Sequence, residues 1–325
     1  MCTAVSYTSQ DHYFGRNLDL EYSYQECVSV TPRNYPFHFR KAPSLPTHYA
    51  MIGMATVADD FPLYYEATNE KGLSIAGLNF PGNAAYLPEQ ENKINIAPFE
   101  LIPYLLGQCE SVAQVREKLK EINIANIAFN DAYPLSPLHW IMADRQQAIT
   151  VEPMADGLHI YDNPVGVLTN NPPFDFHLYN LRNYLNVSAA PAISRFSAGY
   201  DIQPYSNGMG GLGLPGDYSS ASRFVKAAFV KLNSVSGSDE AESVHQFFHI
   251  LSAVAMPRGC IEVRPGEFEI TRYSCCCNTD RGIYYYRTYE NSRTVGIDLR
   301  RENLNGCNLS RFPLVIHEPI EIQNR

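Results

Sequence analysis

The first twenty residues, MCTAVSYTSQDHYFGRNLDL, decide the fold of this chain. Residues 3–8 form a strand-like run, the turn-forming triplet Ser-Gln-Asp follows at 9–11, and a second strand-like run covers residues 12–24. If the triplet joins an antiparallel hairpin, paired residues have numbers that sum to about 20. The pattern therefore predicts that Cys2 lies opposite Leu18, give or take one residue, at the open end of the hairpin.

This register places a cation and a carboxylate beside Cys2. Arg16 would favour the thiolate form of the cysteine, and Asp19 would accept hydrogen bonds from the terminal amine. Residues 16 and 19 point to opposite faces of a regular strand, so we expect a bulge or bend between Gly15 and Leu18. The alternative is a solvated surface pair, which is the usual state of an arginine and an aspartate.

The position of Cys2 next to the initiating methionine makes it a candidate nucleophile. Methionine aminopeptidase removes Met1 when the second residue is small, and the product then carries a thiol and a free amine on one residue. A free α-amino group has a pKa of about 7.7–8.0 and can act as a base near neutral pH. A nucleophile with a base one residue away suits N-terminal nucleophile chemistry. Alone the signal is weak, because many chains have an inert cysteine at this position.

Composition narrows the class of protein. The 325 residues are 45% apolar and 18% charged, which is typical of a globular chain, and the net charge of −9 argues against nucleic-acid binding. No apolar run approaches the roughly 20 residues of a membrane span, so we expect no membrane association. Eight cysteines are too few for a disulfide scaffold, and no secretory signal precedes the first strand. We therefore expect a cytoplasmic protein with reduced thiols.

The order of predicted elements indicates one domain over residues 1–325. Strands, a helix pair, strands, a second helix pair and further strands follow one another, which favours sheets with helices stacked outside them. The predicted helices span residues 98–109, from 111 onward, 219–235 and 239–255, and the predicted strands include 50–56, 63–69, 73–78, 139–143, 148–153, 157–161, 166–168 and a hairpin across 278–282.

Other familiar catalytic, phosphate-binding and metal-binding motifs are incomplete in this sequence. The segment 72–76 resembles a nucleophile elbow, but Ala76 breaks the pattern, and the glycine-rich loop at 208–216 lacks the following G-K-[ST]. His245 and His249 have metal-ligand spacing on a helix but no evident third ligand. The three cysteines at 275–277 alternate across a strand and are expected to be buried, not metal-bound.

Several blocks of this sequence resemble the choloylglycine hydrolase family, which contains conjugated bile salt hydrolases and penicillin V acylases. The blocks span residues 1 to about 290, so the resemblance covers nearly the whole chain. They are Met1-Cys2-Thr3-Ala4, Phe14-Gly15-Arg16-Asn17-Leu18-Asp19, Leu78-Asn79-Phe80, Leu135-Ser136-Pro137-Leu138-His139-Trp140, Val167-Leu168-Thr169-Asn170-Asn171-Pro172, Leu214-Pro215-Gly216-Asp217 and Ser222-Arg223-Phe224.

The resemblance implies an α+β fold, the four-layer αββα sandwich of N-terminal nucleophile (Ntn) hydrolases, and amide hydrolysis without metal or cofactor. It implies that Cys2 is the nucleophile and, through its α-amine, the base, with Arg16 and Asp19 beside it. The backbone N–H of Asn79 and the side-chain amide of Asn170 would form the oxyanion hole. Arg223 would add positive charge. Asn171 is the alternative to Asn170, which we favour because the family pattern T-N-[NS]-P fixes the first asparagine.

The resemblance also indicates a substrate class. Penicillin V acylases of this family typically carry tyrosine where this chain has Asn79, whereas bile salt hydrolases carry asparagine. The sequence therefore resembles an enzyme that cleaves glycine or taurine from a steroid acid. Leu18, Phe61, Tyr24 and Phe129 are candidates for an apolar substrate cleft, with ordinary packing as the alternative for each.

Three functions remain open at this point. The first is hydrolysis of conjugated bile salts, the second is hydrolysis of penicillin V or another N-acyl amide, and the third is non-catalytic binding of steroid acids. The family resemblance further suggests a homotetramer.

Overall fold

The predicted hairpin is present in the computed structural model, which describes residues 1–324. Strand β1 (Cys2–Thr8) pairs antiparallel with β2 (His12–Leu20), and the register joins Cys2 to Leu18 and Thr8 to His12. The prediction of the register is confirmed. The second strand is shorter than the predicted run to residue 24, because it ends at Leu20 before a pair of bends.

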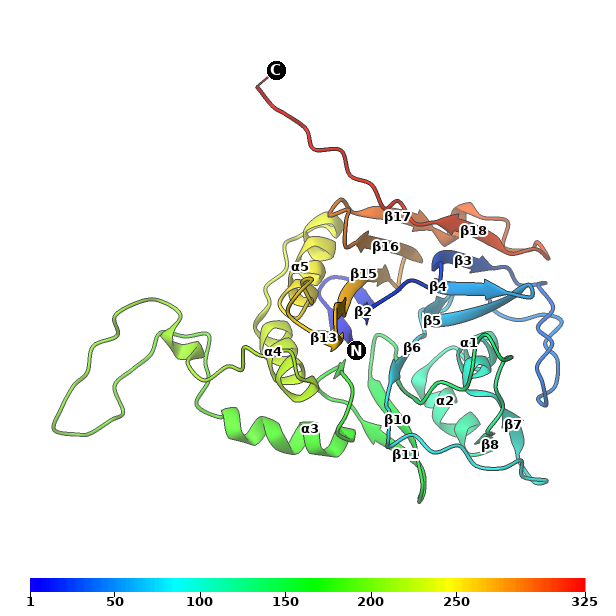
Figure 1. Ribbon diagram of the computed structural model, residues 1–325, viewed down its shortest axis with the longest axis horizontal. Helices are drawn as coiled ribbons and strands as arrows, with labels where there is room; N and C mark the ends of the chain where they lie inside the picture. The colour runs from blue at the N-terminus through cyan, green and yellow to red at the C-terminus, as the bar shows by residue number, and fades with distance from the viewer. Residues whose placement is uncertain (325) are drawn as a thin grey trace.

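Two antiparallel sheets face each other at the centre of the molecule (Figure 1). Within residues 1–324, the first sheet has the order β12 (Val167–Leu168), β1, β2, β15 (Ile270–Asn278), β16 (Ile283–Thr288) and β17 (Val295–Asp298). The second has the order β11 (Gly157–Asp162), β10 (Ala148–Met154), β9 (Leu138–Ala143), β6 (Ser74–Asn79), β5 (Phe61–Asn69), β4 (Met51–Ala58), β3 (Cys27–Thr31) and β18 (Ser310–Pro313).

The smaller elements lie around these sheets. Short strands pair as β7 (Ile94–Ile96) with β8 (Ile122–Ile124) and as β13 (Glu262–Arg264) with β14 (Glu267–Phe268). The α-helices are α1 (Leu101–Gln108), α2 (Val112–Leu119), α3 (Phe174–Asn180), α4 (Ser220–Asn233) and α5 (Glu240–Ser252), and 3₁₀ turns span Pro98–Glu100, Leu181–Tyr184, Met209–Gly211 and Leu299–Arg301. No helix of the part described here has the length and apolar character needed to cross a membrane.

Helix pairs cover the outer faces of both sheets. α4 and α5 lie on the first sheet, over β1, β2 and β15. α1 lies on β5 and β6 of the second sheet, and the apolar side chains of α2 pack in the same hydrophobic cluster as those of α1. The helix starts predicted at residues 111 and 239 are confirmed. The Ser111 side chain caps α2, and Asp239 and Glu242 form a capping box at α5. The four layers are therefore helices, sheet, sheet and helices, as the αββα prediction requires.

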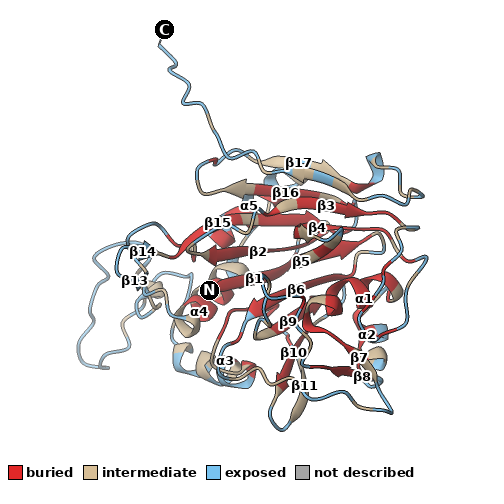
Figure 2. Ribbon diagram, turned by 45° about the vertical axis from the view of Figure 1, so that its right-hand side comes forward, coloured by how far each residue is buried: buried red, intermediate tan, exposed pale blue. Residues whose placement is uncertain are grey.

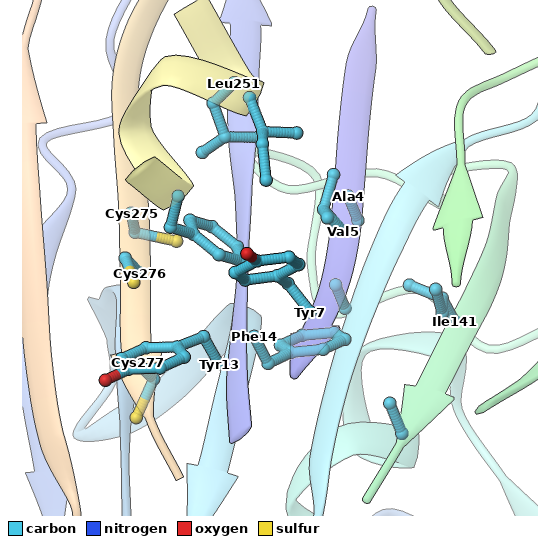
Figure 3. Packing of buried hydrophobic residues seen from close by; sticks show 14 of the residues in the cluster. Ala4, Val5, Tyr7, Tyr13, Phe14, Ile141, Leu251, Cys275, Cys276 and Cys277 are labelled. Carbon is cyan, nitrogen blue, oxygen red and sulfur yellow. The ribbon is translucent and has the colours of Figure 1, made fainter. Parts of the chain in front are cut away.

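Burial follows these layers (Figure 2), and the most buried segments are the central strands. Figure 3 shows part of this core, with Phe14, Leu251 and the three cysteines at 275–277 among its labelled residues. All three cysteines are buried, and burial raises the pKa of Cys277 to about 12. They are unreactive core residues, as their alternation along the strand indicates.

The predicted bulge in β2 is wrong. β2 pairs with β1 without interruption, and the irregularity lies in β15, where Arg272 is the extra residue between Thr271 and Tyr273. Gly15 has another role in β2. A Cβ at this position would lie 1.9 Å from the carbonyl oxygen of Cys275, so glycine allows β2 and β15 to approach closely beside the reactive end of the hairpin.

Candidate active site

Cys2 begins β1 and lies at the open end of the hairpin, 4% exposed. Its backbone N–H donates to Oδ1 of Asn170 at 2.9 Å, and its carbonyl accepts from Nη1 of Arg223 at 2.5 Å. Residues 170 and 223 are far from Cys2 in sequence, yet they fix both polar groups of its backbone. The nitrogen of Cys2 is thus already held where a terminal amine would act.

Asn170 and Arg223 are joined to each other. Nη2 of Arg223 donates to Oδ1 of Asn170 at 2.7 Å, which leaves Nδ2 of Asn170 to donate to the carbonyl of Asn79 at 2.6 Å. The orientation of the Asn170 amide is therefore determined by its partners. The neighbouring Asn171 points elsewhere and donates to the carbonyl of Pro81, so Asn170 is the residue that contacts Cys2.

Arg16 lies between the two sheets. Its Nη1 donates to the carbonyls of Gly77 at 2.5 Å and Tyr65 at 3.1 Å, and its Nε is 3.8 Å from the carboxylate of Glu66. Burial tends to lower the pKa of the Arg16 guanidinium, but electrostatic interactions with Cys2, Tyr273 and Glu66 raise it overall. Arg16 is therefore a fixed cation near Cys2, and its Nη2 has no hydrogen-bond partner among the described residues.

Asp19 lies on the opposite face of β2. By strand alternation it shares that face with Asn17, whose amide donates to the carbonyl of Leu251 in α5. Oδ1 of Asp19 accepts from Thr271 at 2.6 Å, whereas Oδ2 has no partner within residues 1–324. Burial raises the pKa of Asp19, and the charge of Arg223 works against this shift. Arg16 and Asp19 therefore flank the chain terminus from two faces, without the shared face that a bulge was expected to give.

Met1 extends the hairpin by one further pair. Its amine donates to the carbonyl of Asp19 at 2.8 Å, and its carbonyl accepts from the Asp19 N–H at 3.0 Å. The amine also forms an ion pair with Glu269. Burial lowers the pKa of this α-ammonium. The Met1 amine is therefore shifted toward its unprotonated form.

A cavity of about 190 Å³ lies next to β5 and β6 of the second sheet. Tyr65 and Gly77, whose carbonyls bind Arg16, line it, and so do the predicted residues Tyr24 and Phe129. The other two predicted pocket residues do not line it. Phe61 packs edge-on against Phe99 and lies near Phe129, both of which line the cavity, and Leu18 is buried opposite Cys2. The structure thus brings together the catalytic candidates but only half of the pocket candidates.

Several residues of this site were not predicted from the sequence. Glu66 is fully buried and accepts hydrogen bonds from the hydroxyls of Tyr273 at 2.8 Å and Tyr284 at 2.6 Å. A carboxylate inside a strand of apolar neighbours was the available signal, since such a group is buried only with partners. Ser220, which accepts from the Asn170 N–H at 2.8 Å, gave no signal, because a serine at a helix start is ordinary.

Metal ligation has no support in the described part of the chain, where no three histidine, cysteine or acidic side chains converge. The chemistry that the arrangement can perform follows from a thiol, an adjacent nitrogen and amide donors. This set suits attack on a carbonyl carbon and stabilisation of the resulting oxyanion.

Comparison with known proteins agrees with this chemistry. The profile described as "Linear amide C-N hydrolases, choloylglycine hydrolase family" matches residues 2–312. The "Bile salt hydrolase/transferase" of Lactiplantibacillus plantarum is 54% identical over 314 residues, which are 97% of each chain.

Solved structures agree as well. A crystal structure of a variant of the conjugated bile acid hydrolase from Clostridium perfringens has a TM-score of 0.91 and 36% identity, covering 99% of this chain and 100% of the other. A penicillin V acylase from Agrobacterium tumefaciens shares the fold, with a TM-score of 0.77 and 17% identity over 96% and 91% of the two chains. The protein is a hydrolase and not solely a binder: the chain belongs to the choloylglycine hydrolase family of linear amide C–N hydrolases.

Proposed function

We propose that this chain hydrolyses the amide bond of glycine- or taurine-conjugated bile salts and releases free bile acid and amino acid. The observation that carries the proposal is the hydrogen bond from the Cys2 nitrogen to Asn170, which Arg223 also holds. It combines with a relative of 54% identity that is named a bile salt hydrolase and transferase. Asn79, the residue that the family resemblance associates with bile salts, lies in contact with Asn170.

The first half of the reaction forms a thioester. After Met1 is removed, the α-amine of Cys2 accepts the thiol proton, and Sγ attacks the amide carbon of the substrate. The backbone N–H of Asn79 and the free N–H of the Asn170 amide donate to the oxyanion, and each such donor is worth about 2.7–4 kcal/mol. The α-ammonium then protonates the leaving nitrogen as the C–N bond breaks.

The second half regenerates the enzyme. The α-amine takes a proton from water, and the hydroxide attacks the thioester carbon through a second oxyanion. The C–S bond breaks, the bile acid leaves, and the proton returns to the thiolate. Arg16 and Arg223 favour the anionic species throughout, and Asp19 orients the terminal amine.

The steroid would enter the cavity of about 190 Å³ that Tyr65 and Gly77 line. Its lining is mainly apolar and aromatic, including Phe99, Phe129 and Trp140, which suits a steroid nucleus. Tyr24 and Phe129 are proposed to contact the steroid. Leu18 is proposed to shape the substrate site beside Cys2, its partner in the hairpin. Phe61 is proposed to shape it through its contacts with Phe99 and Phe129.

Side-by-side turnover of glycocholate, taurocholate and penicillin V tests the substrate class. We expect both bile salts to be cleaved with a kcat/KM well above that of penicillin V. Faster turnover of penicillin V would overturn the bile salt assignment and favour the acylase alternative.

Intact mass tests the base. We expect the active protein to begin at Cys2, since an amide nitrogen after a retained Met1 cannot accept the thiol proton. A purified protein that is fully active and still carries Met1 would exclude the α-amine as the base.

We further propose a cytoplasmic homotetramer in which residues 1–325 form one domain. All eight cysteines, which lie within the described residues, are free, and this suits a reducing compartment. The segment between α3 and α4 extends away from the body (Figure 1) and exposes large apolar side chains, among them Leu185 at 84% and Phe196 at 80%. Such a surface is typical of subunit contacts. Light scattering after gel filtration would measure the assembly, and a monomer would exclude it.

A further inference from the structure

A second group of buried polar residues lies behind the oxyanion hole, centred on His139 of β9 and Glu152 of β10. Both side chains are 0% exposed, and Nδ1 of His139 lies 2.9 Å from Oε1 of Glu152. Neither residue contacts Cys2, and the proposed reaction gives neither of them a proton to transfer. An ionisable pair removed from water in this way needs complete hydrogen bonding, and it is often retained for a function.

His139 is bonded to the segment that carries Asn170. Its Nε2 donates to the carbonyl of Thr169 at 3.0 Å. Because a carbonyl only accepts, this nitrogen carries a proton, and the Nδ1–Oε1 bond holds one further proton. The histidine thus fixes the backbone one residue before the amide donor.

The same imidazole touches the segment that carries Asn79. Its ring stacks on Phe80, with centroids 4.2 Å apart and planes 5° from parallel. Phe80 directly follows Asn79, and the Phe80 N–H is bonded to the carbonyl of Pro137 at 2.8 Å. One side chain therefore contacts the neighbours of both proposed oxyanion donors.

Glu152 contacts both His139 and the start of α3. Its two oxygens accept from the backbone N–H of Phe174 at 3.2 and 3.1 Å. Phe174 lies four residues beyond Asn170, so the carboxylate and the histidine hold the segment 169–174 at both ends. His177 adds a third anchor, since its Nε2 donates to the carbonyl of Asn170 at 3.0 Å.

We propose that His139 and Glu152 are a positioning pair that sets the distance and angle between the two oxyanion donors. The pair acts through Thr169 and Phe80 and does not touch the substrate. This role also accounts for the block Leu135–Trp140, which the sequence singled out and the proposed reaction left unused. The inference rests on the proposed hydrolysis at Cys2.

The test separates donor geometry from folding. In Glu152→Gln and His139→Gln, we expect kcat to fall by about 10–100-fold, because a misplacement of about 1 Å has this order of effect. KM and the binding of glycocholate to the same variants made in a Cys2→Ala background should stay unchanged. Affinity for a bile acid aldehyde, which forms a tetrahedral adduct with Cys2, should fall in parallel with kcat.

His12→Gln is the matched control. His12 is also a buried histidine with two side-chain hydrogen bonds, but it lies at the turn end of the hairpin. We expect it to lower stability without changing kcat or aldehyde affinity. Loss of stability in Glu152→Gln with full kcat and full aldehyde affinity would overturn the positioning role. If the wild type cleaves no bile salt, the proposed function fails first, and aldehyde affinity alone then decides the role of the pair.

Discussion

The two ends of the β1–β2 hairpin bury similar polar groups in different ways. At the turn end, His12 binds Ser6 at 2.9 Å and Thr279 at 2.8 Å, and its backbone N–H donates to Asp280 at 2.7 Å. At the open end, Nη2 of Arg16 and Oδ2 of Asp19 are buried without a partner within residues 1–324.

The difference separates structure from chemistry. A neutral histidine with both ring nitrogens satisfied costs little to bury, whereas a buried polar atom without a partner is costly and is often found at a functional site. In the proposed reaction, the unpartnered oxygen of Asp19 is available to a terminal amine, and the unpartnered nitrogen of Arg16 is available to a developing anion. The comparison therefore agrees with the proposed placement of the reaction at the open end of the hairpin.

The largest expected effect comes from Cys2→Ala, at the open end. Turnover of glycocholate should fall by roughly 10⁴-fold or more, because a lost nucleophile is not replaced by its neighbours. The unfolding midpoint should change little. The paired change is Ser6→Ala on the same strand, which removes one hydrogen bond and should cost about 1 kcal/mol of stability with kcat unchanged. Equal losses of activity in the two variants would contradict the division of the hairpin.

A smaller effect is expected from Arg223→Lys. Arg223 donates to the carbonyl of Cys2, to Thr3 and to Asn170, and a single ammonium cannot reproduce this planar fork. We expect kcat to fall by about 100-fold through misplacement of the amide donor. Arg145→Lys is the control, because Arg145 pairs with Asp280 at the turn end and is half exposed. A loss of kcat in the control as large as that in Arg223→Lys would argue against a local role for Arg223.

The smallest effect concerns pH. Burial lowers the pKa of His12 to about 4, whereas an unfolded histidine titrates near 6.5. Between these values the unfolded chain binds more protons, so acid destabilises the fold. This residue should contribute a loss of about 2 kcal/mol between pH 7 and pH 5. Urea unfolding at both pH values should show a smaller loss in His12→Gln, and identical losses in the two proteins would refute the assignment.

The sequence was sufficient for the hairpin because its information is local. The turn triplet sets the register of Cys2 against Leu18, and the family resemblance supplied Asn79, Asn170 and Arg223 at positions that the fold brings together. The starts of α2 and α5 were likewise predictable, since each capping residue is adjacent in sequence to its helix.

Long-range features could not be predicted in this way. The irregularity beside Asp19 belongs to β15, about 250 residues later, and nothing in β2 encodes it. Glu66, Tyr273 and Tyr284 meet only when the two sheets stack. The position of Phe61 relative to the cavity could not be predicted either, because an aromatic residue at a strand end has the same local pattern whether it lines a cavity or packs against its lining residues.

The close approach at Gly15 has a consequence for directed evolution. Any side chain at this position would meet the Cys275 carbonyl, and Sγ of Cys275 accepts a hydrogen bond from the backbone N–H of Arg16 at 3.3 Å. In a library that varies the whole hairpin, position 15 should remain glycine in every active clone, whichever bile salt is used for selection. It would therefore report on the integrity of the scaffold, whereas variation at Tyr24 or Phe129 would report on substrate choice.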